Sequence, residues 1–516
     1  MRSRPTARSL FWVVVALLVA SVPAVGGPGA PRAGGTLTVG SLVDVESLDA
    51  HHHGTAHTHM MVSQIYEQLL DLDPQGRYIG VLAESWNISN DGVTYTFRLR
   101  KNVKFHDGTP FTAEAVKVNL ERVVDPATKA RYAGRLGAMQ SVQVVDDHTV
   151  AIRLRRKDIL FLEALRSPAY IVSPAALRRH GKDYGTHPAG TGPFKIQSYA
   201  PDDRLVLVRN EDYWGGRPPL DRVVFRPVPE QATRLVELES GGVDVITDVP
   251  HKDAKTLEAR RIQVLVTGGF QADYYVFNLK RPPLDDVRVR KAINHAIDRD
   301  TLTRVVYRGY AIKSITGYPP NGWAINTAVK GYDFDPERAA QLLQEAGWKP
   351  GAESIREKGG TRLRLHMPTP SHQVLLAQLI QGQLRRVGIE TRLDMTEAAT
   401  YWDAVRTGKF DLGYWVRFVG HAEPSAYFNY FDSKEHWFTM QQPHPEIEAL
   451  LNEGVATIDP AARKRIYDQV QRRIADEALV IWITHPKFLF ALRPHVKGVV
   501  TPPSLRLWLH KAWVER

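Results

Sequence analysis

Apolar and polar positions alternate in the stretch of sequence that begins at Tyr95. Tyr95, Phe97 and Leu99 are separated by threonine and arginine, and this period of two predicts a strand with one buried face. Residues 90–92, Asn-Asp-Gly, are a turn signal directly before this strand. Residues 86–89 are therefore expected to pair with it as a hairpin.

A helix is predicted after a second polar turn at residues 106–110. Thr112 stands at the position of a helix cap, and the apolar residues Val116, Leu120 and Val123 follow at helical spacing. The hairpin, the turn and the capped helix form a structural unit. Nothing in this unit is arranged for catalysis.

Strands and helices are expected to alternate along the rest of the chain. Strands are expected within residues 36–39, 142–154 (as a hairpin), 205–209, 241–246, 363–366, 389–393 and 479–483. Helices are expected within residues 65–70, 233–239, 287–297, 336–346, 374–387 and, for the most part, 440–473. Alternation of this kind indicates an α/β protein.

The first 24 residues have the pattern of an export signal. Arg2, Arg4 and Arg8 precede or flank the apolar run 10–20, and small residues precede a cleavage site after Ala24. The run is short for a membrane span and is typical of a secretory signal peptide. An uncleaved membrane anchor is the alternative.

Composition narrows the class of protein further. Of the 516 residues, 43% are hydrophobic and 24% are charged, as in globular proteins of several domains. The formal net charge is +11, but basic and acidic residues are interspersed, so a nucleic-acid partner is not indicated. The absence of cysteine excludes disulfides, thiolate metal sites, a cysteine nucleophile and a lipidated cysteine.

Motifs of enzymes that bind phosphate, zinc or dinucleotides do not occur in the sequence, and neither does a hydrolase nucleophile motif. We therefore expect neither an enzyme nor a bound cofactor. A secreted hydrolase remains the alternative from a different class of protein.

The segment 83–122 resembles the signature of a known family. Ala-Glu-Ser-Trp at 83–86, Asp-Gly at 91–92 and Phe-His-Asp-Gly-Thr-Pro at 105–110 stand at the spacing of the family 5 extracellular solute-binding proteins, the peptide/nickel-type receptors of ABC importers. The resemblance extends over residues 36–510. It implies a type II periplasmic-binding-protein fold, in which two α/β lobes joined by a hinge close on a ligand in the cleft between them, with an extra third domain.

The resemblance also implies domain boundaries and partners. The expected division is a signal peptide at 1–24, lobe I at 33–63, 188–272 and 488–516, the extra domain at 64–187, and lobe II at 273–487. The mature protein is expected to be a soluble, periplasmic monomer without a lipid anchor. It would deliver a small ligand to a permease and an ATPase made as separate chains.

Histidines are concentrated before and within the first ligand-facing segment. These residues are His51, His52, His53, His57 and His59. His57 and His59 reach one metal ion if the segment is extended, since imidazole is a common metal ligand. The alternatives are solvated histidines in a polar loop, or residues that line the ligand. The resemblance places ligand contacts at His57, His59 and Met60.

A second ligand-facing segment is expected at residues 415–424. Its candidate contacts are Trp415, Arg417, Phe418, His421 and Glu423. In peptide-binding members an aspartate at the position of Gly420 neutralises the ammonium group of the peptide. Its absence argues against an ordinary peptide unless Glu423 substitutes.

Arg417 indicates a carboxylate or another anionic group on the ligand, with a plain surface arginine as the alternative. His436 stands near the position where nickel-binding members carry a histidine, so His59 and His436 are the candidate metal ligands. We predict a receptor for a small peptide or peptide-like, anionic ligand. A receptor for nickel or another metal chelate is the alternative within the family.

Overall fold

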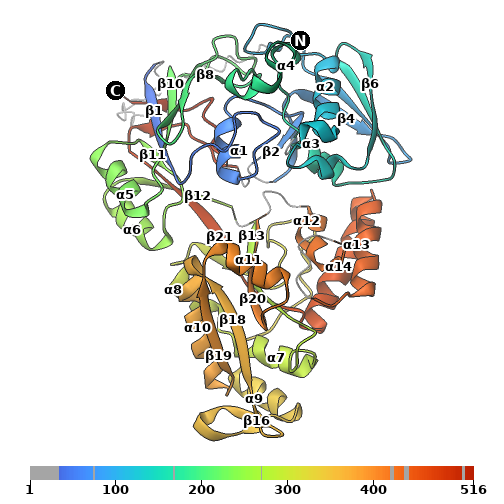
Figure 1. Ribbon diagram of the computed structural model, residues 1–516, viewed down its shortest axis with the longest axis vertical. Coiled ribbons are helices and arrows are strands. Elements are labelled where there is room, and N and C mark those ends of the chain that lie inside the picture. The colour runs from blue at the N-terminus through green and yellow to red at the C-terminus, as the bar shows by residue number, and fades with distance from the viewer. Residues whose placement is uncertain are drawn as a thin grey trace, which may run out of the picture.

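The computed structural model describes residues 34–73, 76–166, 169–268, 270–418, 423–434, 441–502 and 506–515. The predicted signal peptide therefore lies outside the described residues. Figure 1 shows an upper part, formed by residues 34–268 and 488–515, and a lower part, formed mainly by residues 271–483. Strands near the centre of the molecule run between the two parts.

The largest sheet has the strand order β20-β13-β21-β11-β1-β10-β9-β8, with β12 and β14 also paired to β21. Its strands are β1 (Thr36–Ser41), β8 (Phe194–Ala200), β9 (Arg204–Arg209), β10 (Arg222–Pro227), β11 (Val245–Ile246), β12 (Gln263–Gly268), β13 (Gln271–Phe277), β14 (Ala311–Lys313), β20 (Leu412–Phe418) and β21 (Val480–Leu492). β1 runs parallel to β10 and β11, whereas β21 is antiparallel to its neighbours.

Strand β21 belongs to both parts of the molecule. Its first half pairs with β13 up to Asp273 opposite Thr484, and its second half pairs with β12 from Gly268 opposite Lys487. The backbone pairing thus passes from the lower part to the upper part within residues 484–487. These few residues are one place where the backbone crosses between the two parts, as hinge segments do in two-lobed proteins.

A second, four-stranded sheet stands in the upper part, in the order β4-β5-β7-β6. It is formed by β4 (Ala83–Ile88), β5 (Thr94–Leu99), β6 (Met139–Asp146) and β7 (Thr149–Leu154). The helices of the upper part are α1 (Ala56–Val62), α2 (Ala113–Val124), α3 (Phe161–Arg166), α4 (Pro174–His180), α5 (Gln231–Ser240) and α6 (His251–Ala259). Small pairs are β2 (Leu70–Leu72) with β3 (Tyr78–Gly80), and β22 (Val496–Lys497) with β23 (Trp513–Val514).

The lower part combines a parallel strand pair with helices. β18 (Arg364–Pro370) and β19 (Glu390–Thr396) are parallel and are connected by α10 (Val374–Arg386), which buries Leu376, Ile380 and Leu384. The other helices are α7 (Val287–Ala296), α8 (Arg299–Val306), α9 (Pro336–Glu345), α11 (Ala398–Arg406), α12 (Pro424–Phe428), α13 (Pro445–Ala456) and α14 (Pro460–Asp476). A small sheet is formed by β15 (Lys349–Pro350), β16 (Arg356–Lys358) and β17 (Thr361–Arg362).

Buried apolar side chains form separate cores. The largest cluster lies wholly within residues 272–483, and a second lies within residues 69–171. A third joins Leu37 near the beginning of the described chain to Val514 near its end. Each core is built mainly from one sheet and the helices on it, as expected for packed layers of secondary structure.

Glu67 connects three segments of the upper part. Its carboxylate accepts hydrogen bonds from the hydroxyls of Thr191 (2.8 Å) and Tyr213 (2.8 Å) and from the indole N–H of Trp214 (2.7 Å). Burial raises the pKa of Glu67 from 4.5 to about 7, although these three bonds oppose the shift. The junction therefore contains an acid that titrates near neutral pH.

The structure confirms most of the predicted elements and corrects one. The hairpin β4–β5 and helix α2 are present, and Thr112 stands at the N-cap position of α2 although its side chain makes no capping hydrogen bond. The helix expected at residues 65–70 is wrong: Glu67 forms a bridge with Ile171, and strand β2 begins at Leu70. A short run of buried apolar residues does not distinguish a helix from other buried backbone.

Candidate functional site

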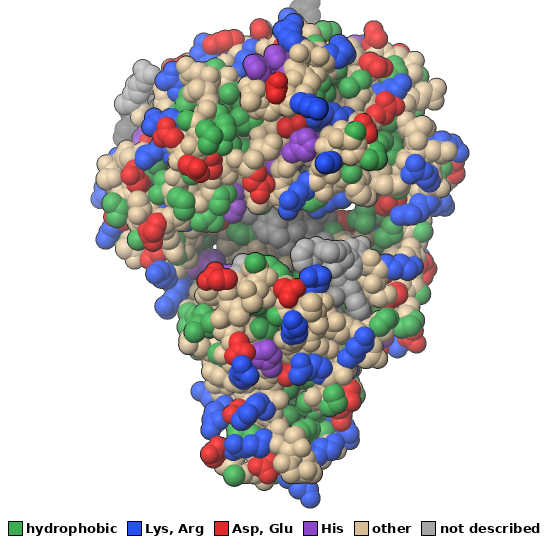
Figure 2. Space-filling view, in the orientation of Figure 1, with side chains coloured by type: hydrophobic (Ala, Val, Ile, Leu, Met, Phe, Trp, Pro, Cys, Tyr) green, Lys and Arg blue, Asp and Glu red, His purple; other side chains and the backbone are tan. Residues whose placement is uncertain are grey.

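Helix α1 brings the histidine-rich segment to the side of the upper part that faces the lower part (Figure 1). The Thr55 side chain caps this helix by accepting the backbone N–H of Thr58 (3.3 Å). The Glu46 carboxylate accepts the N–H groups of Gly54 (2.6 Å) and Thr55 (3.1 Å), which places a negative charge at the positive end of the helix dipole. Figure 2 shows that the surface is hollowed between the two parts.

The histidine pair of α1 does not converge on one point. His57 and His59 are two positions apart on a helix, so their side chains leave its axis about 200° apart. A metal site shared by these two residues would require an extended segment. The segment is helical, so that prediction is wrong. Each imidazole instead meets its own partner.

His57 forms an ion pair with Asp248, which follows β11. The distance from Nε2 to Oδ2 is 2.9 Å. Burial lowers the pKa of His57, but the hydrogen bond and charge of Asp248 outweigh burial and raise it above 6.5. His57, Met60, Phe488 and other residues line a pocket of about 240 Å³, including the space open to solvent.

His59 points into the upper part, where both ring nitrogens are occupied. The Nε–H of Arg506 donates to Nε2 of His59 at 2.7 Å. The ring proton is therefore on Nδ1, which lies 2.9 Å from the hydroxyl of Tyr170. Burial and the charge of Arg506 hold the pKa of His59 well below 6.5. His59 is thus a neutral, fully engaged imidazole.

Arg506 also joins a network of buried charges under α1. Only 2% of its side chain is exposed, and its Nη1 lies 2.5 Å from Oδ2 of Asp71. Nearby, Nη2 of Arg166 pairs with Glu163 at 2.5 Å. Buried charges are tolerated when they are paired and hydrogen-bonded, so these residues hold α1 in place.

Two of the three preceding histidines are buried as well, so the interpretation of a solvated loop does not hold for His51 and His53, whereas His52 is exposed. His51 accepts from Arg122 through Nδ1 (2.6 Å) and donates to the carbonyl of Tyr170 through Nε2 (2.9 Å). His53 packs against the ring of His59 at 5.6 Å. Burial lowers the pKa values of His51 and His53 to about 4, so both are neutral at pH 7.

In the lower part, the second predicted segment begins on β20. Trp415 is buried, with its ring 4.9 Å from that of Trp402 and 5.4 Å from that of Tyr430. The backbones of Arg417 and Phe418 pair with β13 at the end of β20. The segment therefore starts at the edge of the largest sheet, next to the residues that connect β12 with β13.

Glu423 has a structural role in this geometry. It is buried, forms an ion pair with Arg463 of α14 and caps α12. The hydroxyl of Ser425 donates to it at 3.0 Å. Because Arg463 already balances its charge, Glu423 is not available to replace the missing aspartate at Gly420. His421, Gly420 and His436 lie outside the described residues.

Sequence reasoning missed a group of basic residues beside α1. Arg131, Tyr132 and Arg135 follow α2, and the Tyr132 hydroxyl donates to the carbonyl of Gly54 at 2.5 Å. Arg131 packs so closely on Gly54 that a Cβ there would stand 2.5 Å from its Nε. Arg135 lies over the ring of Tyr132 at 4.3 Å. The only signal in the sequence was the basic run that these residues share with Lys129.

The described part of the chain contains neither a membrane-spanning helix nor a cluster of metal-ligating side chains. None of its helices combines the length and apolar character needed to cross a membrane. Within the same residues, no three His, Asp or Glu side chains are grouped closely enough to hold a metal ion. The histidine cluster therefore does not form a metal centre of this kind.

Two α/β parts, joined by strands and separated by a groove, define the type II periplasmic-binding-protein fold. Residues 77–439 match the family model of bacterial extracellular solute-binding proteins, family 5. The chain belongs to this family. Its members include substrate-binding receptors of ABC importers.

Relatives of known name agree with this assignment. The glutathione-binding protein GsiB of Escherichia coli O157:H7 is 30% identical over 481 residues, covering 89% of this chain and 90% of the relative. The GsiB of Pectobacterium atrosepticum is 30% identical over 516 residues, with 96% of each chain covered. NikA from Brucella suis, solved with Fe(III)-EDTA, has a TM-score of 0.85 at 27% identity and covers 93% of this chain and 100% of its own.

The structure is also similar to that of a binding protein solved with a bound peptide. The periplasmic binding protein DppA from Helicobacter pylori, solved with the peptide STSA, has a TM-score of 0.77 at 25% identity. The match covers 94% of this chain and 99% of that structure. The fold therefore accommodates both peptides and metal chelates in different proteins.

Proposed function

We propose that this receptor binds a small, anionic, peptide-like molecule in the groove between its two parts. The observation that carries the proposal is the gathering of Arg131 and Arg135 beside α1, with Arg417 at the end of β20 on the lower part. Guanidinium groups bind carboxylates with directed, paired hydrogen bonds. A ligand with carboxylates at its ends would join the two parts.

The named relatives support a ligand of this chemistry. GsiB is a glutathione-binding protein, and glutathione is a short peptide-like molecule with two carboxylates. Reduced glutathione is therefore the first compound to test. The ligand-lining roles of His57, Met60, Trp415, Phe418 and His421 belong to the same proposal.

The domain division is also part of the proposal. The core within residues 272–483 would correspond to lobe II, and the core within 69–171 to the extra domain. Lobe I would combine segments from both ends of the chain, since Leu37 and Val514 share a core. Closure would then rotate the lobes about residues 484–487 and the connection between β12 and β13.

We further propose that the protein works in the periplasm as a soluble monomer after removal of residues 1–24. It would deliver its ligand to a separate permease and ATPase and would carry out no catalysis itself. The arginines before the apolar run at residues 10–20 support export. Cell fractionation with amino-terminal sequencing tests this, because a membrane-bound form that retains Met1 contradicts it.

Isothermal titration calorimetry tests the ligand. We expect reduced glutathione or a short acidic peptide to bind with a dissociation constant in the micromolar range or below. The monoethyl ester of glutathione, which lacks one carboxylate, is the matched control and should bind at least about tenfold more weakly, the effect of a lost charged hydrogen bond. Equal binding of acid and ester would contradict the anionic site.

The structural similarity to NikA keeps a metal chelate as the second candidate. A chelate with free carboxylates would use the same arginines. Because His59 is engaged by Arg506, His436 is the remaining sequence-predicted candidate for a histidine contact to the metal. Calorimetry with nickel–histidine complexes separates the cases: tight binding that His436→Ala abolishes would favour the chelate, and its absence would favour the peptide-like ligand.

A further inference from the structure

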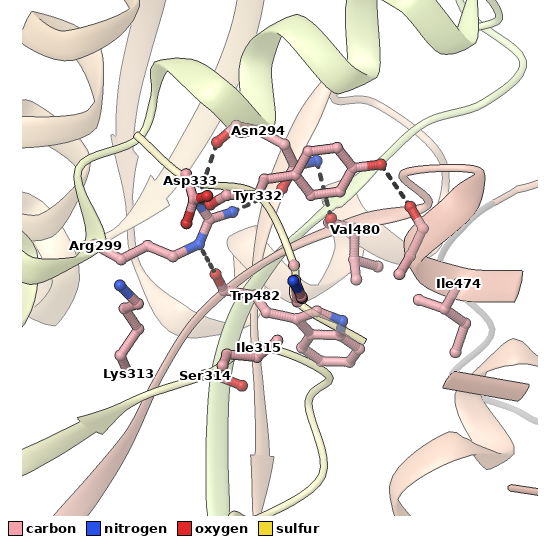
Figure 3. Close-up of a pocket in the computed structure, with 13 residues that line it drawn as sticks. Asn294, Arg299, Lys313, Ser314, Ile315, Tyr332, Asp333, Ile474, Val480 and Trp482 are labelled. Carbon is pink, nitrogen blue, oxygen red and sulfur yellow. Dashed lines mark hydrogen bonds between the residues drawn. The ribbon is translucent and has the colours of Figure 1, made fainter. Parts of the chain in front are cut away.

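A pocket in the lower part lies apart from the groove and from every residue assigned above. Figure 3 shows it between the carboxyl end of α7, the start of α8, the segment after β14 and the end of α14. It measures about 420 Å³, including the space open to solvent. Its apolar wall is formed by Ile315, Ile474, Val480 and the ring of Trp482.

The base of the pocket holds a buried cation. Arg299 is 6% exposed, and its guanidinium donates to the carbonyl of Trp482 (2.6 Å) and to the backbone and side-chain oxygens of Asn294 (3.0 and 2.7 Å). Longer bonds reach the carbonyls of Ile297 and Tyr332, both at 3.3 Å. All of these acceptors are uncharged.

No carboxylate oxygen of the described residues lies within 4.0 Å of this guanidinium. Arg506, Arg166 and Arg463 are buried and each pair with an acid, whereas Arg234, Arg290 and Arg356 are buried against carbonyl oxygens as Arg299 is. Arg299 differs from Arg234, Arg290 and Arg356 in lining a pocket together with Lys313 and Lys330. Burial lowers the pKa of Arg299 to about 10, although the nearby Tyr332, Asp300 and Asp333 oppose this shift. Arg299 nevertheless remains a cation at pH 7.

Two more cations line the same pocket from the side of solvent. Lys313 ends β14 and Lys330 lies in the segment before α9; both are exposed. Lys313 forms an ion pair at 3.1 Å with Asp300, which does not itself line the pocket. Asp333 is the one acid among the lining residues, so cations outnumber acids around the opening.

We propose that this pocket is a binding site for a small oxyanion, such as inorganic phosphate, sulfate or a short carboxylate. The anion would sit between the three cations and balance the charge of Arg299. It would connect α8, β14 and the segment 330–333. Because β14 pairs with Thr484, His485 and Pro486, the site lies beside the hinge strand and not in the ligand groove.

Thermal unfolding with added phosphate tests the proposal on the full chain. At constant ionic strength, phosphate should raise the melting temperature in a saturable manner, because a ligand that binds only the native state stabilises it by mass action. The variant Lys313→Gln/Lys330→Gln should weaken phosphate binding at least tenfold by calorimetry. Parallel titrations with sulfate and acetate identify which oxyanion the pocket prefers.

A charge-matched control is Lys255→Gln/Lys349→Gln, which removes two exposed lysines elsewhere. It should bind phosphate as the wild type does. Asp333→Asn should act in the opposite direction and tighten binding several-fold, because it removes the repelling charge from the lining. A shift of equal size in the control variant, no saturable shift in the wild type, or no gain from Asp333→Asn would overturn the proposal.

The test of phosphate binding does not depend on the function proposed for the groove. The Lys313→Gln/Lys330→Gln variant should keep the affinity of the groove for glutathione. Loss of phosphate binding with retained glutathione binding supports the second site. If this variant lost glutathione binding but kept phosphate binding, the two lysines would act on the groove, and the proposed oxyanion site would be wrong.

Discussion

Arg506 and His59 are joined by a hydrogen bond of 2.7 Å from Nε to Nε2, although 447 positions separate them in the chain. The same guanidinium pairs with the buried carboxylate of Asp71. The segment after β21 therefore returns to the upper part and holds the helix that we propose to contact the ligand. This contact connects the stability of the fold to the shape of the site.

Arg506→Gln should destabilise the protein strongly. It leaves the buried Asp71 carboxylate with only the more distant guanidinium of Arg166, 3.9 Å away, and loss of one partner of a buried pair costs about 3–5 kcal/mol. Urea unfolding measures the change in the free energy of unfolding. The double variant Arg506→Gln/Asp71→Asn should recover a large part of this loss, and a strictly additive double variant would show that the pair is not coupled.

The His57–Asp248 pair should make stability depend on pH. The folded pKa of His57 is raised above 6.5, so its contribution is complete below about pH 6.5 and is lost as the pH rises through the folded pKa. The Asp248 pKa is lowered from 3.8, burial being outweighed by the bond to His57, so its contribution is lost only in stronger acid. His57→Gln should cost about 0.5–1 kcal/mol at pH 5.5, because the pair is partly exposed, and little at pH 8.5.

Asp248→Asn is the matched variant for this pair. It should lower the free energy of unfolding with the same pH dependence, and combining it with His57→Gln should add little. A cost that is equal at pH 5.5 and pH 8.5 would show that the charge of His57 makes no contribution.

Glu67 should also make stability depend on pH, in a lower pH range than His57. Its folded pKa of about 7 lies above its ordinary value of 4.5, so the native state binds the proton more tightly. The associated stability is present below about pH 4.5 and is lost as the pH rises to 7, a change on the order of 3 kcal/mol. Urea unfolding compared between pH 5 and pH 8 should show a smaller loss of stability in Glu67→Gln than in the wild type, because the variant keeps the contribution of His57 but lacks that of Glu67.

Arg131→Gln/Arg135→Gln should lower affinity for glutathione, or for whichever acidic peptide binds, by at least about tenfold, because each arginine removed takes a charged donor from the carboxylate. Arg178→Gln/Arg179→Gln, on the exposed side of α4, is the charge-matched control and should bind normally. Calorimetry at low and moderate salt measures both. Equal losses in the two variants would indicate a general effect of net charge.

Arg417→Ala tests the contribution of the lower part. We expect a loss of at least about tenfold in affinity for an anionic ligand, corresponding to about 1.5–3 kcal/mol for a hydrogen bond to a charged group. Binding of the glutathione monoethyl ester should respond less if Arg417 meets the esterified carboxylate. Unchanged affinity for both compounds would place the anionic end of the ligand elsewhere.

Much of the local structure was predictable from the sequence. The alternation at Tyr95, Phe97 and Leu99 and the helical spacing after Thr112 are patterns of residues a few positions apart, and β5 and α2 formed as expected. The conformation of the histidine segment was not predictable in the same way. His57 and His59 carry no apolar period, and the helix there is held by Thr55, by Glu46 and by its docking on Arg506.

The sequence by itself determined the family, the α/β class and the order of most strands and helices, because these follow from short-range patterns and motifs with fixed spacing. Only the tertiary structure decided the partners of the charged residues. His57 pairs with Asp248, His59 with Arg506 and Glu423 with Arg463, whereas the guanidinium of Arg299 is hydrogen-bonded to uncharged acceptors. These outcomes depend on contacts between segments far apart in the chain and on burial, which sets the cost of each charge, and neither is written in the local sequence.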